Sequence, residues 1–323
     1  MTEPTRPQPL PSEDSPPEYP GQHTRRGQRD RQTGNIPIIR PDKYGDPTMP
    51  PPTPVALARL FVTLLAAGLT GCIIVASILQ SWAVIGAIFG LQVLTVATFV
   101  WLRRPAGTLI TIGTGIVVSA IADVIAIYTQ PFSLDRLAYV LAGAFGLVVL
   151  GQITRTNREG LTVAIGAAML VSTLVCMYAA WIGLLRHPGG SDAIMISAVA
   201  IGSGVVAARA CDLTLPRPRI NRQVPRGAFG VVIGAMFAAA GAAYASMALD
   251  VAGPGKVAVG GLVIGLVGVL ADVAAGYLQA GRRISGQGVA PWPVRHGLGP
   301  LMAFGAAAPV AFMLGAYYLV GGI

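Results

Sequence analysis

Long apolar stretches alternate with short polar segments over residues 55–323 of this chain. The first stretch, Leu60 to Leu102, contains 43 residues without a charge, about twice the roughly 20 that an α-helix needs to cross a bilayer. It must therefore contain two helices, and Gln80, Ser81 and Trp82 supply a polar and aromatic turn between them. We expect these helices at about Val55 to Leu79 and Ala83 to Leu102.

The same rule predicts seven further spans, each an apolar run long enough to cross a bilayer. They lie at about Gly107 to Thr129, Leu137 to Thr154, Leu161 to Leu185, Ala193 to Ala210, Gly227 to Leu249, Val257 to Ala280 and Leu298 to Val320. The predicted fold class is an all-α, polytopic integral membrane protein with about nine transmembrane helices. A composition of 53% hydrophobic and 11% charged residues excludes an ordinary water-soluble enzyme.

Residues 1–54 have the opposite character. Fourteen of the 25 prolines lie between Pro4 and Pro54, and the segment has almost no apolar residues except Ile36, Ile38 and Ile39. Such a segment cannot bury enough surface to offset the entropy of ordering, so we predict a disordered tail. No apolar h-region follows the first residues, so we expect no signal peptide and a tail that stays on the mature protein.

The net charge of +9 would by itself suggest a nucleic-acid partner. The tail, however, holds seven positive and seven negative charges, so the whole excess belongs to the apolar part and we expect no nucleic-acid binding. Cytoplasmic loops retain Arg and Lys, and with the tail inside, thirteen positive residues fall on the inner side and three on the outer. The inner residues are Arg59, Arg103, Arg104, Arg155, Arg158, Arg209, Arg217, Arg219, Arg222, Arg226, Arg282, Arg283 and Arg295, and the outer ones are Arg136, Arg186 and Lys256. This bias predicts a cytoplasmic N-terminus and an external C-terminus.

The sequence contains few residues suited to metals or cofactors. The three cysteines, Cys72, Cys176 and Cys211, have no metal or disulfide spacing, and we interpret them as small buried hydrophobes. The three histidines are dispersed, and there is no Walker motif, dinucleotide fingerprint or Ser/His/Asp set, so we expect no cofactor. Twenty-one Arg against two Lys, with abundant Ala and Gly, indicates a bacterial genome and hence a bacterial cytoplasmic membrane.

Two acidic residues lie inside predicted spans. Asp123 interrupts the third span and Asp272 lies in the inner half of the eighth, about ten residues before Arg282 and Arg283. Ionisable residues are expensive within a bilayer and are therefore candidates for function. The alternative for each is a structural carboxylate that packs between helices or pairs with an Arg.

Two predicted inner loops concentrate the arginines. The first, Leu213 to Arg226, contains prolines that prevent a regular helix, and the second is Gly281 to Gly297. Guanidinium groups suit phosphate oxygens, so these loops are candidates for binding a phospholipid headgroup or a nucleotide phosphate. The alternative is that they set the topology and attract anionic lipid loosely, at about 1 kcal/mol per residue. The candidate residues are Arg217, Arg219, Arg222, Arg226, Asp272, Arg282, Arg283, Arg295 and His296.

Glycines recur at small-xxx-small spacing within the spans, as in Gly230 and Gly234 or Gly261 and Gly265. This spacing allows helices to approach closely. We interpret it as helix packing rather than as a phosphate-binding loop.

The last four predicted spans and their loops contain residues that match parts of a known set of family motifs. PRINRQVPRGAFG, with Pro218, Ile220, Gly227 and Phe229, occupies the place of an inner loop reading Pro-x-Ile-Ser-Pro-Lys-Lys-x-x-Glu-Gly. Further on, Asp272 matches the Asp of Gly-Asp-Leu-x-Glu-Ser, and His296-Gly297 and Ala308 to Ala311 resemble later landmarks. Over about residues 155–315 the chain thus resembles the phosphatidate cytidylyltransferase (CDP-diacylglycerol synthase) family.

That resemblance implies about nine spans, a cytosol-facing site, a dimer, and CTP and phosphatidate as substrates with a divalent metal. Several positions depart from it: Ala275 replaces a Glu, Gln279 and Ala280 replace a basic pair, Gln223 and Val224 replace two lysines, and the final Asp-Arg-x-Asp is absent. Metals beside a triphosphate need several carboxylate ligands, and only Asp272 remains. We therefore predict a non-catalytic relative with an Arg-lined lipid-headgroup site, with Mg²⁺ only if the family activity were retained.

Two other functions stay open. Asp123 and the glycine-rich spans suit a small-solute permease. The Pro-rich tail, with its Arg25 to Arg31 cluster and the segment Ile36 to Ile39, suits a structural membrane subunit that recruits a protein partner through residues 1–54.

Overall fold

A computed structural model describes residues 55–156, 159–215, 217–221, 224–251, 253–284 and 291–315. The predicted disordered tail, residues 1–54, lies outside this part of the chain, as do Arg158 and Arg222. Within it, nine helices are long and apolar enough to cross a membrane, in agreement with the number expected. They are α2 (Val55–Leu79), α3 (Ser81–Arg103), α4 (Thr108–Tyr128), α5 (Leu134–Ile153), α6 (Leu161–Leu185), α7 (Gly190–Thr214), α8 (Ala228–Leu249), α9 (Pro254–Ile284) and α10 (Trp292–Leu314).

The turns that separate the helices follow from local chemistry. Between α2 and α3 the side-chain oxygen of Gln80 accepts a hydrogen bond of 2.7 Å from Trp82 Nε1. Between α3 and α4, Arg104 and Gly107 both have positive φ, of 43° and 76°. Glycine adopts that conformation without steric cost, and Pro105 cannot continue the α3 ladder.

Several expected helix boundaries are wrong, and they lie near charged residues. Helix α7 continues past Ala210 to Thr214, α9 continues past Ala280 to Ile284, and α10 begins at Trp292 rather than Leu298. Helices α5, α7 and α9 each begin three residues before the expected start, at Leu134, Gly190 and Pro254. Arg282 and Arg283 are therefore in the last turn of α9, and Arg295 is in the first turn of α10, rather than in a loop. Hydropathy places the end of a helix at its first charges, although Arg and Gln have good helix propensity.

The segment between α7 and α8 departs from an all-α fold. It forms an antiparallel hairpin of β1 (Arg219–Asn221) and β2 (Val224–Gly227), with an irregularity between the paired residues. The prolines that precede and interrupt it exclude a helix, as the sequence predicts.

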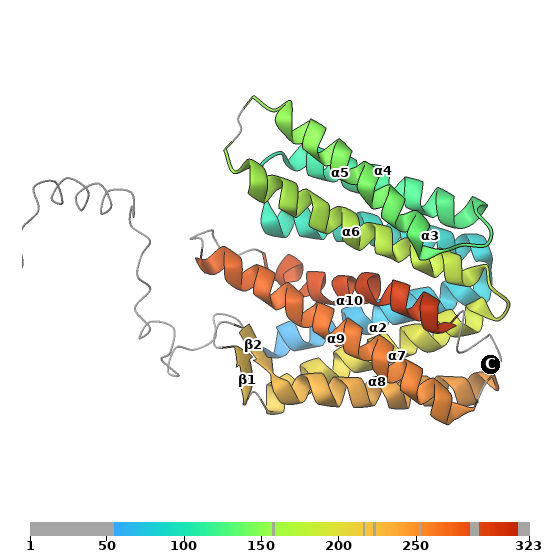
Figure 1. Cartoon of the computed structure of the whole chain (residues 1–323). Helices are drawn as coiled ribbons and strands as arrows, with labels where there is room; N and C mark the ends of the chain where they lie inside the picture. Colours follow the sequence, from blue (N-terminus) through green and yellow to red (C-terminus); the bar gives the residue numbers. More distant parts are fainter. Residues whose placement is uncertain are drawn as a thin grey trace, which may run out of the picture. The chain divides into compact units, whose positions relative to one another are not determined.

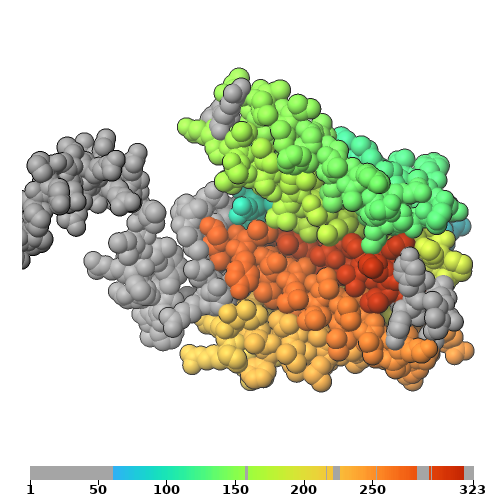
Figure 2. Space-filling view, in the orientation of Figure 1, coloured from blue at the N-terminus to red at the C-terminus, as the bar shows by residue number. Residues whose placement is uncertain are grey.

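The helices form two groups joined by α10. Helices α3 to α6 pack together, α7, α8 and α9 pack together with α2 against α7, and α10 contacts both groups (Figure 1). Figure 2 shows α9 and α10, in orange and red, lying between the surfaces of α5 and α8. The α6 side chains of Tyr178 and Trp181 donate hydrogen bonds to backbone oxygens of α10, at Leu301 (2.6 Å) and Phe304 (3.2 Å).

Small residues allow the close approach of α7, α8 and α9. A Cβ atom at Gly265 of α9 would overlap Ala238 of α8, and one at Gly234 of α8 would lie 2.8 Å from the Cβ atom of Ala208. The predicted packing role of these glycines is confirmed, since no side chain larger than hydrogen fits at this spacing.

The outward faces of the helices are apolar. Leu109, Tyr128, Tyr139, Trp82 and Ile78 are each more than two-thirds exposed. Water-soluble monomers rarely expose apolar patches of this extent, so these faces suit a lipid environment.

Candidate functional site

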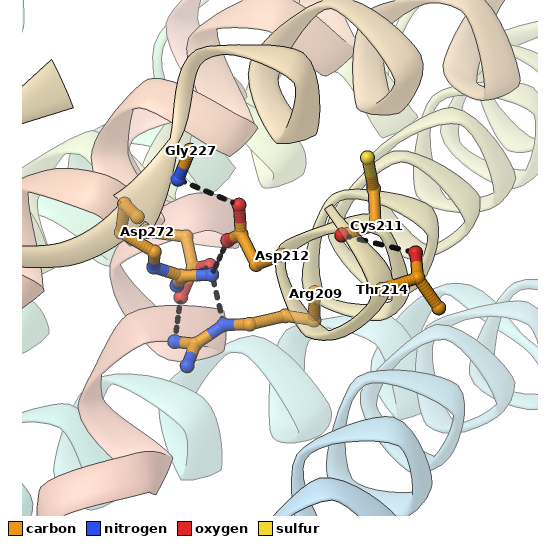
Figure 3. A network of polar contacts seen from close by, with 7 residues as sticks. Arg209, Cys211, Asp212, Thr214, Gly227 and Asp272 are labelled. Carbon is orange, nitrogen blue, oxygen red and sulfur yellow. Dashed lines mark hydrogen bonds and ion pairs between the residues drawn. The ribbon is translucent and has the colours of Figure 1, made fainter. Parts of the chain in front are cut away.

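The C-terminal end of α7 places two opposite charges on one face. Arg209 and Asp212 are three residues apart, so their side chains project from neighbouring positions on the helix surface. Both point to the interior position where α7 meets the start of α8 and the middle of α9 (Figure 3). The helix can continue through these charges because each side chain has a partner there.

The β-hairpin carries Arg226 into the same position. The amide N–H of Gly227, which follows it, donates to Asp212 Oδ1 at 2.9 Å, and the N–H of Ala228 donates to the Pro218 oxygen at 2.9 Å. These bonds fix the hairpin against the end of α7. They also place the Asp212 carboxylate at the N-terminus of α8, where the helix dipole favours a negative charge.

Asp272 of α9 joins the two arginines. Arg209 donates to both of its carboxylate oxygens, with a distance of 2.7 Å from Nε to Oδ2, and Arg226 donates from Nη2 to Oδ2. Arg226 also donates from Nη1 to Asp212 Oδ2 at 2.8 Å. Arg209, Asp272, Arg226 and Asp212 thus form a continuous chain of alternating charges, called here the ion network (Figure 3).

The ion network is buried and electrically balanced. The side chain of Asp272 is fully buried, those of Arg226 and Asp212 are 5% and 7% exposed, and that of Arg209 is 21% exposed. Removing such charges from water is costly unless each is paired and hydrogen-bonded. The network meets that condition, and it ties α7, α9 and the hairpin together.

Two glycines make room for these charged groups. A Cβ atom at Gly299 of α10 would overlap the Asp272 carboxylate and lie 2.7 Å from Arg209 Nη2. A Cβ atom at Gly230 of α8 would overlap Asp212. The backbones of α8 and α10 therefore pack directly against the carboxylates.

The remaining predicted residues surround the ion network or lie beyond it. Arg295 is buried, its backbone oxygen accepts a hydrogen bond from Gln279 Nε2, and His296 is half-buried. His296 is close enough to Arg209, Arg226 and Asp272 for electrostatic interaction. Arg217 and Arg219 are exposed on the segment that leads into and forms the hairpin.

Sequence reasoning thus selected Arg226 and Asp272 but missed Arg209 and Asp212 as site residues. Arg209 counted only toward topology, and Asp212 lay beyond the expected end of its span. Their three-residue spacing at the end of a span was the signal that could have identified them.

Asp123 belongs to a separate place in the fold. It lies on α4, where Asp123 Oδ1 accepts a hydrogen bond of 2.8 Å from Gln92 Nε2 of α3. The same Gln92 nitrogen donates to the backbone oxygen of Val175 on α6 at 3.0 Å. This polar contact lies within the α3 to α6 group rather than at the ion network.

Metal ligands are not clustered in the described part of the chain, where no group of three or more His, Cys, Asp or Glu side chains is placed to hold an ion. Cys176 and Cys211 are buried, as expected of small hydrophobes, but Cys72 is exposed on the outer face of α2. All three are free thiols.

Comparison of the chain with protein-family models, with curated proteins and with solved structures gives no match.

Proposed function

We propose that this chain is a multi-pass protein of the bacterial cytoplasmic membrane that binds the phosphate group of anionic phospholipids at the arginine-rich end of α7 to α10. In this proposal that end and the N-terminus face the cytoplasm. The protein is a non-catalytic relative of CDP-diacylglycerol synthases that acts in envelope lipid metabolism or its organisation.

The proposal rests on one observation. Both acidic residues at this end of α7 to α10, Asp212 and Asp272, are ion-paired within the ion network. Asp212 and Asp272 together neutralise Arg209 and Arg226. At this end of α7 to α10 the sequence therefore supplies more arginines than acidic residues, which gives the end a surplus of positive charge. The additional arginines include Arg217, Arg219, Arg282 and Arg283.

A phosphate group suits that excess. Guanidinium groups present planar pairs of N–H donors that match phosphate oxygens, and these bonds are stronger than those between neutral groups. The exposed Arg217 and Arg219 lie at the end of apolar helices, which is the depth at which lipid headgroups would stand. Juxtamembrane arginines attract anionic lipids with about 1 kcal/mol each.

The geometry of Asp272 supports the absence of cytidylyl transfer. Both of its oxygens accept hydrogen bonds from guanidinium groups. A carboxylate engaged in this way has little capacity to ligate Mg²⁺, and Ala275, one turn away, supplies no second carboxylate. Among the described residues, no group of three or more His, Cys, Asp or Glu side chains is placed to supply the family's metal ligands.

The experiment is native mass spectrometry of the purified full chain, after exposure in mild detergent to equal amounts of phosphatidate, phosphatidylglycerol and phosphatidylcholine. We expect retention of the two anionic lipids over phosphatidylcholine. The Arg217→Gln/Arg219→Gln variant should lose most of that preference, while a Lys256→Gln control at the opposite end of the helices should keep it. Equal retention of all three lipids would overturn the proposal, and turnover of CTP with phosphatidate and Mg²⁺ would overturn its non-catalytic part.

A further inference from the structure

A buried polar pair lies where α3, α4 and α6 meet. Asp123 is 4% exposed and Gln92 is fully buried. The orientation of the Gln92 amide is determined by its two acceptors, because Nε2 donates both to Asp123 Oδ1 and to the Val175 oxygen. Gln92 is near the middle of α3, far from either end of the helix.

Helices α3, α5 and α6 pack against α4. Among the described residues, the side chain that hydrogen-bonds to Asp123 is that of Gln92 on α3, which is neutral. The ionisable residues of α6 are Cys176, whose Sγ donates to the Leu137 oxygen at 3.7 Å, and Tyr178, whose hydroxyl donates to α10. None of the ion pairs formed by the described residues includes Asp123.

An ionised carboxylate at this position would be expensive. Burying an unpaired charge in an apolar interior costs several kcal/mol at least, and in practice such a group becomes neutral instead. Asp272, by contrast, has two arginines within hydrogen-bonding distance. The arginines therefore offset the cost of a buried negative charge at Asp272, whereas no such partner offsets it at Asp123 among the described residues.

The pair also contains two buried oxygens that have no hydrogen-bond partner among the described residues, Asp123 Oδ2 and Gln92 Oε1. Both accept hydrogen bonds when Asp123 is ionised, so neither can satisfy the other. A proton on Oδ2 converts that oxygen to a donor. The planar carboxyl and carboxamide groups could then pair through two hydrogen bonds, N–H to Oδ1 and O–H to Oε1.

We propose that Asp123 and Gln92 form a proton-binding site, in which a neutral Asp123 carboxyl group donates its hydrogen to Gln92 Oε1. One proton satisfies both oxygens and removes the buried charge. A metal ion is a poorer fit, since a hard cation takes several oxygen ligands and this pair offers two. The site is independent of the lipid-binding proposal, because it involves different helices.

Infrared difference spectroscopy tests the protonation state directly. Spectra of the wild-type chain and of Asp123→Asn are compared at neutral pH, in H₂O and in D₂O. We expect the wild type to show a C=O stretching band of a protonated carboxyl group that is absent from the variant. If Asp123→Asn instead removed the stretching bands of an ionised carboxylate, the proposal would be overturned. Asp212→Asn is the matched control. Asp212 is ion-paired, so its replacement should remove carboxylate stretching bands and should leave the C=O band of the protonated carboxyl group in place.

Thermal unfolding in detergent gives a second readout. An amide at position 123 preserves both hydrogen bonds, so Asp123→Asn should unfold close to the wild-type temperature, whereas Asp123→Leu should unfold at a clearly lower one. Failure of Asp123→Asn to fold would overturn the proposal. A sodium effect would also overturn it. If the wild type unfolded at a higher temperature in sodium chloride than in choline chloride and Asp123→Asn removed that difference, Na⁺ would be the ligand.

Discussion

Gly299 of α10 lies directly against Asp272 of α9, so that a side chain at position 299 would overlap the buried carboxylate. The absence of a Cβ atom allows the backbone of α10 to cover the ion network. This contact links the most buried of the nine helices to the charged groups that hold α7, α9 and the hairpin together.

Gly299→Ala should therefore destabilise the protein. The added methyl group must displace either Asp272 or α10, and overpacking of this kind costs about 1–3 kcal/mol. Gly297→Ala is the matched control on the same helix, because a Cβ atom there would meet only Leu65 Cδ2 at 3.6 Å, an ordinary contact. The unfolding midpoint in detergent should fall for the first variant and not for the second, and equal midpoints would contradict the close packing.

Removal of Asp272 should be the most damaging single change in the ion network. Asp272→Asn leaves Arg209 and the buried Arg226 without their shared carboxylate, and breaking a buried pair costs about 3–5 kcal/mol. Asp212→Asn should cost less, because Arg226 keeps Asp272 and the Asn oxygen still accepts from Gly227. Denaturant titration of the two variants gives the order, and a larger loss for Asp212→Asn would contradict the geometry.

Asp212 and Arg226 should also be energetically coupled. In an Arg226→Met background, Asp212→Asn should cost less than it does in the wild type, because the partner charge is already gone. Contacting pairs of this kind show interaction energies of about 0.5–3 kcal/mol in double-mutant cycles. Additive costs of the two substitutions would indicate that the 2.8 Å ion pair contributes nothing measurable to stability.

The predicted orientation can be tested with single cysteines. In a background lacking Cys72, Cys176 and Cys211, the variants Arg219→Cys and Lys256→Cys place thiols at exposed positions on opposite ends of the helices. An impermeant maleimide added to right-side-out vesicles should label position 256, and it should label position 219 only after the membrane is permeabilised. The reverse pattern would place the arginine-rich end outside.

Helix packing predicts opposite outcomes for two glycines of α9. Gly265→Ala should lower stability by about 1–3 kcal/mol, because the new Cβ atom overlaps Ala238 of α8. Gly260→Ala meets nothing within 4 Å and should be neutral or stabilising by about 0.5–1 kcal/mol, because alanine loses less conformational entropy in a helix. The comparison of their unfolding midpoints checks both, and a similar loss for Gly260→Ala would contradict it.

The sequence alone determined the number and approximate limits of the nine helices. Both limits of α2 and of α6 were predicted to the residue, because the length of an apolar run is a local property that can be counted along the chain. The largest errors in the helix limits, at Thr214, Ile284 and Trp292, lie near charged residues, and α5, α7 and α9 each begin three residues before the expected start. Charge marks where a helix leaves the hydrocarbon but not where its hydrogen bonding stops.

Only the tertiary structure decided which charges meet. The high cost of an acidic residue in an apolar helix identified Asp272 as a residue that needs compensation, and an arginine was one of the partners left open. Its partners, Arg209 and Arg226, lie 63 and 46 residues away, and many other arginines share the same end of the helices. The packing of α7 against α9 and the path of the hairpin selected those two. Residues far apart in the sequence pack together because doing so buries apolar surface and pairs buried charges. Patterns read along the chain describe only residues that are close in sequence.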